Sequence, residues 1–181
     1  ENNRRKDITL KITNDALYMV KSNCDLENEN AIVLGHKNWH PGVIGIVASH
    51  IKEEFARPAI IISLDDAESR GSCRSIRGFD MVDALGECKN YLTGFGGHPI
   101  AAGLSMKSSD FDSFKREFIK VANEKISTDD LIPTIYVDSK LNLEDVNDRM
   151  IKFLHSMEPY GPGNMLPVFV TNNLSIDGIP K

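Results

Sequence analysis

Short apolar runs alternate with helical patterns through the first half of the chain. AIVLGH (31–36) and RPAIIISL (57–64) are apolar runs typical of buried strands. The segment between them predicts a helix, because its apolar residues recur on one helical face: Val43, Ile44, Val47, Ala48 and Ile51. This order of strand, helix and strand predicts an α/β layer, with a right-handed crossover if the two strands are parallel.

Three further segments extend this layer. SCRSIRGF (72–79) is expected to form a third strand and its exit, and Asp80 is expected to cap a helix over 80–92. GFGGHPIAAGLSM (94–106) predicts a glycine-rich turn that leads into a strand of small residues. The sheet is therefore expected to be mixed and flanked by helices.

A helix is also expected at each end of this unit. The first 22 residues have helical spacing of apolar positions and contain no Gly or Pro. Ser109 and Asp112 have the spacing of a capping box, which predicts the start of the last helix. Its apolar side continues to Ala122, and the unit is expected to close near Ile126.

The remaining residues predict a second, smaller unit. STDDLIP (127–133) has the composition of a linker. A strand is expected in 133–141, a helix in 142–157 and another strand in 168–173. These segments are too few to close a barrel or sandwich, so we expect an incomplete domain. The predicted division is 1–29, 30–126 and 127–181.

Composition places the chain among soluble globular proteins. It has 181 residues, of which 41% are hydrophobic and 26% charged. Its three cysteines form no Cys-x-x-Cys pair, which favours a reducing compartment and predicts a cytoplasmic protein. The longest apolar runs are too short to cross a bilayer, so no membrane role is expected.

The charge distribution favours local over global contact with nucleic acid. The net charge is −5, which is unlike a protein that holds long duplex DNA by charge alone. One cluster nevertheless stands out, because Arg70, Arg74 and Arg77 follow one another without an intervening acid. The cluster is either a local anion-binding surface or an exposed strand that happens to carry arginines.

The segment GFGGH is the strongest candidate for anion binding. Gly96 and Gly97 allow a ligand to approach the backbone closely, and the imidazole of His98 can donate to a phosphate oxygen. A tight turn with a structural histidine is the alternative interpretation.

A second candidate surrounds Trp39 and His40. The helix predicted after Pro41 and Gly42 would present free backbone amides, and Trp39 could stack on a base. A lone tryptophan is more often packed in a core. Acidic ligands are not apparent near the histidines of this region, so no metal site is expected.

The sequence contains no recognisable set of hydrolytic residues. A two-metal phosphoesterase needs several converging Asp and His side chains, and the chain has no Asp-x-Asp or Asp-His-His stretch. A Walker loop and a Gly-x-Ser-x-Gly turn are also missing from the sequence. We therefore expect the chain alone to be catalytically inactive.

Three motifs together resemble the DHH-associated domain of RecJ exonucleases, within the DHH phosphoesterase superfamily. WHPGVIGIVA, SCRSIRGFD and FGGHPIAAG occur in that family's order and approximate spacing. ENNRRKDI is similar to the end of the family's connector helix, and EPYGPGNMLPVF is similar to the opening of its OB-fold domain, where Phe is common at the position of Tyr160. The resemblance covers nearly the whole chain.

The resemblance implies a role in binding single-stranded DNA. RecJ enzymes degrade such DNA from the 5′ end in recombination and repair, with Mn²⁺ or Mg²⁺ held by an upstream DHH domain. By motif match, Arg74, Ser75 and His98 would contact the 5′ phosphate and terminal nucleotides, with Gly96 and Gly97 shaping their segment. The same match makes three further residues possible contacts: Trp39, His40 and Arg77.

Two alternatives remain open. The superfamily includes phosphodiesterases for short oligonucleotides or cyclic dinucleotides, which lack the OB-fold appendage. A non-catalytic nucleic-acid-binding module, as in alanyl-tRNA synthetases, is the other alternative. For the RecJ-like case, we expect Arg74 and His98 to form one pocket for the terminal phosphate.

Overall fold

The computed structural model describes residues 2–175 and 178, and divides the chain into two units. The first unit is Glu1–Pro133 and the second is Thr134–Lys181. This division falls after residue 133, whereas the predicted division fell after residue 126. The difference arises because residues that resemble a linker pack on the first unit, as described below.

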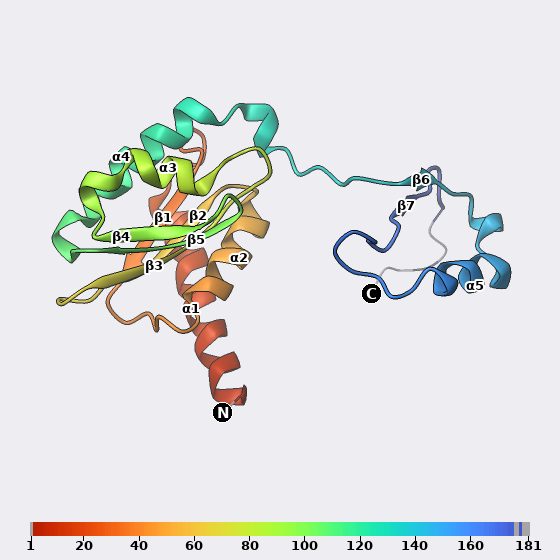
Figure 1. The fold of residues 1–181 in the computed structure, drawn as a ribbon, viewed down its shortest axis with the longest axis horizontal. Helices are drawn as coiled ribbons and strands as arrows, with labels where there is room; N and C mark the ends of the chain where they lie inside the picture. The colour runs from red at the N-terminus through yellow and green to blue at the C-terminus, as the bar shows by residue number, and fades with distance from the viewer. Residues whose placement is uncertain (1, 176–177, 179–181) are drawn as a thin grey trace. The chain divides into compact units, whose positions relative to one another are not determined.

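A five-stranded mixed sheet forms the centre of the first unit (Figure 1). Its strand order is β1-β2-β3-β5-β4. The strands are β1 Ile32–His36, β2 Ala59–Ser63, β3 Ser69–Arg74, β4 Gly94–His98 and β5 Ala101–Met106. Strands β1 and β2 are parallel, as expected for a crossover through a helix, and the other neighbours are antiparallel.

Helices cover both faces of this sheet (Figure 1). The helices α1 Asn2–Asn23 and α2 Ile44–Phe55 lie on one face, and α3 Met81–Glu87 and α4 Phe111–Lys125 lie on the other. A 3-10 turn, η1 Lys89–Tyr91, follows α3. The predicted helix over 80–92 is therefore shorter than expected and ends in this turn.

The two helical layers enclose two separate cores, which explains the uninterrupted apolar run of β2. Side chains alternate along a strand, so Ile60 and Ile62 pack toward α3 and α4 while Ile61 packs toward α1 and α2. All of β2 is buried. Each fully buried isoleucine contributes about 1.5–3 kcal/mol relative to an exposed one, so this strand anchors both layers.

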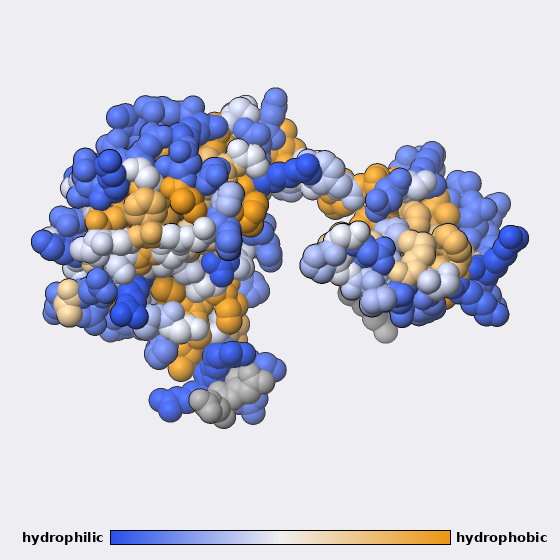
Figure 2. All heavy atoms as spheres, in the orientation of Figure 1, coloured by the Kyte–Doolittle hydropathy of each residue, from blue (hydrophilic) through white to orange (hydrophobic). Residues whose placement is uncertain are grey.

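The helical cover is incomplete on the face that carries α1 and α2. Helix α2 contacts β2 and β3, and no contact of comparable extent links α1 or α2 to β5 or β4 within the described residues. In Figure 2 the surface over β4 is pale, as expected for its glycines. One face of β4 and β5 is therefore open.

The glycine-rich segment is a strand rather than the predicted turn. Gly94–His98 pairs along its whole length with β5, and only Pro99 and Ile100 form the connection between them. Gly97 has φ +147°, and a Cβ atom there would lie 2.5 Å from the carbonyl oxygen of Ala101. Glycine is therefore required at this position for the hairpin to close.

The predicted helix starts have different outcomes. Asp80 caps α3 as expected, since its carboxylate accepts hydrogen bonds from the backbone N–H groups of Val82 and Asp83 at 2.9 and 3.1 Å. The predicted capping box at Ser109 is wrong, because α4 begins after a 3-10 turn, η2 Ser108–Asp110, without a side-chain cap.

A capping box occurs instead in the segment predicted to be a linker. Ser127 is the N-cap of the 3-10 helix η3 Thr128–Leu131 and Asp130 is its third residue. The hydroxyl and the backbone N–H of Ser127 both donate to the Asp130 carboxylate. These hydrogen bonds, the hydroxyl first, lower the pKa of Asp130. Leu131 packs against the core beside α3 and α4, which explains why the first unit extends to Pro133.

The second unit contains little regular structure. Its strands are β6 Ser139–Lys140 and β7 Phe169–Val170, which pair in parallel. Its helices are η4 Leu143–Asp145 and α5 Asp148–Ser156, the latter capped by Asn147. The predicted strands in 133–141 and 168–173 are thus confirmed only as two-residue pairs. Among the described residues, no helix is long and apolar enough to span a bilayer.

Candidate nucleic-acid interface

Alternation along β3 places three polar side chains on the partly open face of the sheet. Arg70, Ser72 and Arg74 are two residues apart, so they share this face, while Cys73 faces the core beside α3 and α4. In the strand register, each of these three residues is aligned with one residue of β5 and one of β4. This gives three rows across the sheet: Arg70–Ser105–Gly94, Ser72–Gly103–Gly96 and Arg74–Ala101–His98.

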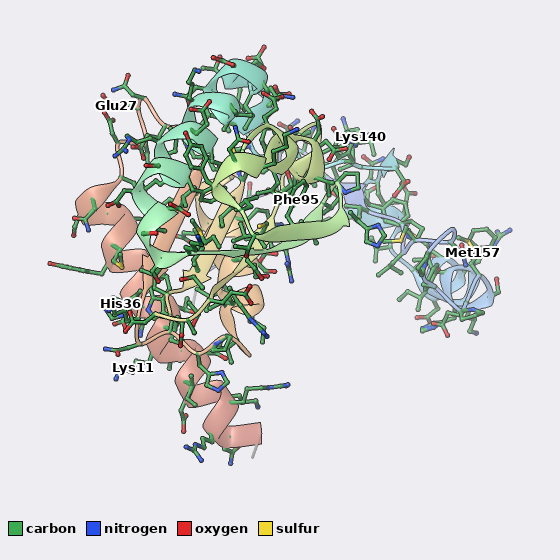
Figure 3. All side chains as sticks on the ribbon, turned by 60° about the vertical axis from the view of Figure 1, so that its left-hand side comes forward. Lys11, Glu27, His36, Phe95, Lys140 and Met157 are labelled. Carbon is green, nitrogen blue, oxygen red and sulfur yellow. The ribbon has the colours of Figure 1, made fainter. Side chains whose placement is uncertain are left out.

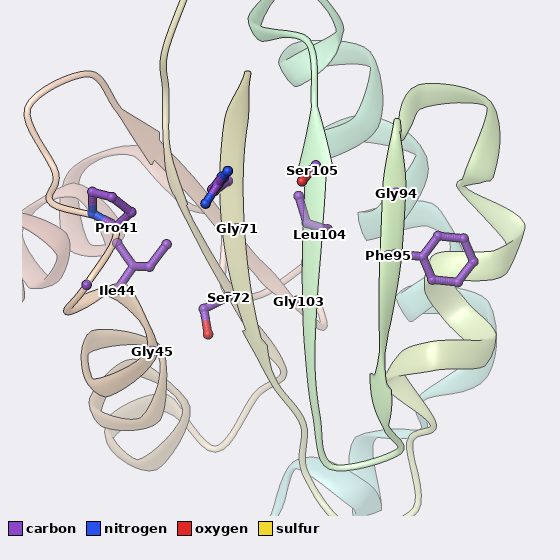
Figure 4. Close-up of a pocket in the computed structure, with 12 residues that line it drawn as sticks. Pro41, Ile44, Gly45, Gly71, Ser72, Gly94, Phe95, Gly103, Leu104 and Ser105 are labelled. Carbon is purple, nitrogen blue, oxygen red and sulfur yellow. The ribbon is translucent and has the colours of Figure 1, made fainter. Parts of the chain in front are cut away.

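The first two rows form the floor of an open groove of about 770 Å³, which Arg70, Ser72, Gly94, Gly103 and Ser105 line (Figure 4). The row of Arg74 continues the same face of the sheet beyond these lining residues. On β5 and β4, the side chains of the three rows are no larger than serine, except that of His98. Phe95 points away from the open face and toward α3 (Figures 3 and 4). The opposite wall is the start of α2 with the residues before it: Pro41, Gly42, Ile44 and Gly45.

Arg74 is held in place by neutral acceptors. Its Nε donates to the hydroxyl of Ser49 at 3.2 Å, and its Nη1 donates to the Ser72 hydroxyl at 3.2 Å and to the Cys73 carbonyl at 2.9 Å. The described residues contain no carboxylate paired with this half-buried cation. The Nη2 group of Arg74 makes no hydrogen bond among the described residues. A fixed guanidinium with a free NH₂ group and no counter-ion is suited to bind an anion.

The first turn of α2 lies directly beside this guanidinium. A Cβ atom at Gly45 would lie 3.2 Å from Nη2 of Arg74 and 3.1 Å from the hydroxyl oxygen of Ser72. The helix has Val43 at its N-cap and no side-chain cap. Its partial positive charge therefore adds to that of Arg74, and Ser72 supplies a hydroxyl donor between them.

His98 lies on the same face as Arg74 but does not meet it. Both residues are level with Ala101, one strand on each side, so their Cα atoms are about 9.5 Å apart, twice the spacing of neighbouring strands. The Arg74 side chain also turns toward Ser49 of α2, away from β4. The two side chains are thus separated across the strands of the sheet, and this geometry does not support one shared phosphate pocket.

The structure gives the other predicted contact residues different positions. Ser75 is buried, and its hydroxyl donates to the Phe79 carbonyl at 2.7 Å. Trp39 is 2% exposed and packs in the core beside α1 and α2, where stacking on a base is not accessible. His40 is exposed in the turn before α2, and its Nδ1 accepts from the Gly42 N–H. Arg77 lies in the turn after β3.

Ser72 was missed in the sequence, and Arg70 was noted only as a member of the arginine cluster. Ser72 and Arg70 precede Arg74 by two and four positions, so strand alternation alone would have placed all three on one face. Ser49 and Gly45 left no such signal, because their proximity to Arg74 depends on how α2 packs on β3. Within residues 2–175 and 178, no three His, Cys, Asp or Glu side chains are grouped to hold a metal ion.

The chain matches two known domain families. The family model of the DHHA1 domain matches residues 28–128, and that of the RecJ OB domain matches residues 137–180. The single-stranded-DNA-specific exonuclease RecJ of Bacillus subtilis is 34% identical over 99% of this chain and 23% of its own length. The RecJ of Haemophilus influenzae is 32% identical over 93% of this chain and 30% of its own length.

Solved structures give the same result. The crystal structure of RecJ in complex with Mg²⁺ from Thermus thermophilus matches with a TM-score of 0.78 and 31% identity, over 93% of this chain and 25% of that one. The chain thus spans about a quarter of the length of these relatives. With the DHHA1 match covering more than half of its residues, the chain belongs to the DHHA1 domain family and is homologous to a part of the RecJ exonucleases.

Proposed function

We propose that this chain is the substrate-binding part of a RecJ-type exonuclease that removes nucleotides from the 5′ end of single-stranded DNA in recombination and repair. In this role, Arg74, Ser72 and the first turn of α2 hold the terminal phosphate. The observation that carries the proposal is the fixed guanidinium of Arg74, which has neutral partners and no counter-ion among the described residues.

The geometry supports recognition of a phosphate over a general attraction to nucleic acid. A guanidinium and a hydroxyl can each donate to a different oxygen of one phosphate, and the α2 terminus favours a doubly charged terminal group over a singly charged diester. Holding Arg74 in place beforehand lowers the entropy lost on binding. A terminal phosphate would thereby set the position of the strand in the groove.

The hydrolytic step belongs to residues outside this chain in our proposal. Relatives include RecJ structures described with Mg²⁺ and with Mn²⁺. Such an ion, held by an upstream DHH domain, would activate the attacking water and stabilise charge on the cleaved phosphate. The residues of this chain would bind and orient the DNA strand. His98 would contact the DNA at the β4 edge, two strands away from Arg74 in the sheet.

The RecJ OB match at residues 137–180 favours the exonuclease over the two alternatives. A phosphodiesterase for short oligonucleotides or cyclic dinucleotides would not need this appendage. A non-catalytic binding module would not need a site that reads the strand terminus. These alternatives also predict different ligand preferences, which makes them testable.

The test compares oligonucleotides that differ only at the 5′ terminus. We expect the chain to bind a 5′-phosphorylated single strand more tightly than the 5′-hydroxyl strand, and Arg74→Ala to remove most of this difference. A charge-assisted hydrogen bond contributes about 1.5–3 kcal/mol, so the loss should be roughly tenfold to a hundredfold. Arg116→Ala, which removes an exposed arginine from α4 on the opposite layer, is the matched control. Equal losses on both strands would contradict a terminal-phosphate site.

A further inference from the structure

We propose that Arg70 is a second phosphate contact, which engages the strand a few nucleotides away from its terminal phosphate and so gives the groove a minimum substrate length. This inference rests on the proposed function, since it takes the Arg74 end as the position of the terminal phosphate. It concerns the opposite end of the same face of β3.

The strand geometry separates the two arginines by more than one phosphate. Arg70 and Arg74 are four residues apart on β3, so their Cα atoms are about 14 Å apart at roughly 3.4 Å per residue. A stacked single strand advances about 3.4 Å per nucleotide, and an extended strand advances further. The distance therefore corresponds to about four stacked nucleotides or fewer extended ones.

Arg70 is available for such a contact. It lines the groove, and its side chain is 71% exposed. It forms an ion pair with Glu68, with 3.8 Å between Nε of Arg70 and Oε2 of Glu68. Glu68 also accepts a hydrogen bond from the hydroxyl of Thr93 at 3.3 Å. An exposed ion pair of this length contributes little, so a phosphate can replace the carboxylate as partner.

The floor beside Arg70 and Ser72 allows a nucleic-acid strand to lie close to the sheet. Cβ atoms at Gly94 and Gly96 would meet no protein atom within 4 Å, and at Gly103 the nearest atom would be the Gly71 carbonyl oxygen at 3.8 Å. The fold thus leaves room for side chains at these positions, yet none is present. The groove therefore stays free of bulky side chains beside Arg70 and Ser72, and Arg74 follows Ser72 on the same face of β3.

The experiment measures affinity as a function of substrate length. The wild-type chain, Arg70→Ala and Arg74→Ala are titrated with 5′-phosphorylated thymidine mononucleotide, dinucleotide, tetranucleotide and hexanucleotide, and binding is followed by NMR, which detects weak complexes. We expect Arg74→Ala to weaken binding of every ligand. Arg70→Ala should leave the mononucleotide unchanged and weaken the hexanucleotide about threefold to tenfold.

Salt dependence gives a second measure of the same contact. Losing one phosphate contact lowers the slope of log affinity against log salt by about 0.7 for a single strand. Arg70→Ala should show this decrease with the hexanucleotide only. Arg70→Lys keeps the charge and should restore most of the affinity, whereas Arg116→Ala should behave as wild type at every length.

Removing the competing carboxylate provides the opposite change. Glu68→Gln should strengthen hexanucleotide binding and leave mononucleotide binding unaltered, because a phosphate would then no longer have to replace the Glu68 carboxylate as the partner of Arg70. Equal effects of Arg70→Ala on all lengths, or no effect on any, would overturn the role of Arg70 even if Arg74→Ala behaves as expected. A mononucleotide insensitive to Arg74→Ala would overturn the proposed terminal-phosphate site instead.

Discussion

Arg74 of β3 donates a hydrogen bond from Nε to the hydroxyl of Ser49 on α2, at 3.2 Å. This contact joins β3, which contributes to the floor of the groove, to α2, whose start forms one wall, and it fixes the direction of the guanidinium. Since Ser49 also donates to the Gly45 carbonyl at 3.2 Å, the arginine is tied to the first turn of the helix. The anion site thus depends on the packing of α2 against β3.

Ser49→Ala should loosen Arg74 without removing its charge. We expect the affinity for a 5′-phosphorylated strand to fall by roughly threefold to tenfold, as one net hydrogen bond is worth about 0.5–1.5 kcal/mol. Because Ser49 would act only through Arg74, the NMR signal of the Arg74 Nε–H should broaden in the free protein. An unchanged Nε–H signal together with a lower affinity would contradict this positioning role.

Alanine substitutions at the neighbouring glycines Gly96 and Gly97 should have different effects. Gly97→Ala should destabilise the first unit by about 1–3 kcal/mol, because φ +147° and the Ala101 carbonyl exclude a Cβ atom. Gly96→Ala should change the free energy of unfolding by less than about 1 kcal/mol, yet weaken nucleic-acid binding by adding a methyl group to the groove floor. Denaturant unfolding and oligonucleotide titration of both variants measure the two effects. Similar unfolding energies for the two variants would refute the assignment.

The cysteines predict a loss of stability at alkaline pH. Burial raises the pKa of the Cys73 and Cys88 thiols to about 12, whereas the ordinary value is 9.0. The unfolded chain therefore releases these protons first, and the free energy of unfolding should fall as pH rises from about 9 to 12. Below pH 9 this contribution is fully present. Cys73→Ala and Cys88→Ala together should flatten this part of the pH profile measured by urea unfolding.

The chain alone should lack metal-dependent exonuclease activity. No group of potential metal ligands occurs among the described residues, and two-metal hydrolysis requires several converging carboxylates and histidines. We expect no release of 5′ nucleotides from a labelled single strand with either Mn²⁺ or Mg²⁺. Release that is abolished by a chelator and survives repurification would show that the chain holds its own catalytic site.

The layered fold could be predicted because the apolar residues of its core segments follow one another without polar interruptions on the buried side. The fully buried β2 and the face of α2 are examples, and the Asp80 cap was visible because an acid precedes an apolar helix. The pattern failed for Gly94–His98, since glycines suggest a turn when the pairing strand is not yet known. Ser109 failed for a related reason: a 3-10 turn places α4 two residues beyond it.

The site was predicted by residue type and only partly by position. Arg74 was identified from an arginine cluster, but its true neighbours come from α2 and from the alternate positions of β3. Ser75 was chosen by motif match, although successive residues in an extended segment point to opposite faces. Applying alternation to the arginines would have selected Ser72 and Arg70 instead. The contribution of α2 depends on tertiary packing, which no local pattern encodes.

The most direct test of the terminal-phosphate site follows the Arg74 Nε–H signal by NMR during titration of the chain with two trinucleotides, one 5′-phosphorylated and one with a 5′ hydroxyl. The terminal-phosphate site predicts that the phosphorylated ligand shifts this signal together with the backbone amide of Gly45, and that the hydroxyl ligand shifts both far less at equal saturation. Equal shifts with the two ligands, or shifts confined to His98 and β4 while Arg74 and Gly45 stay unchanged, would contradict it.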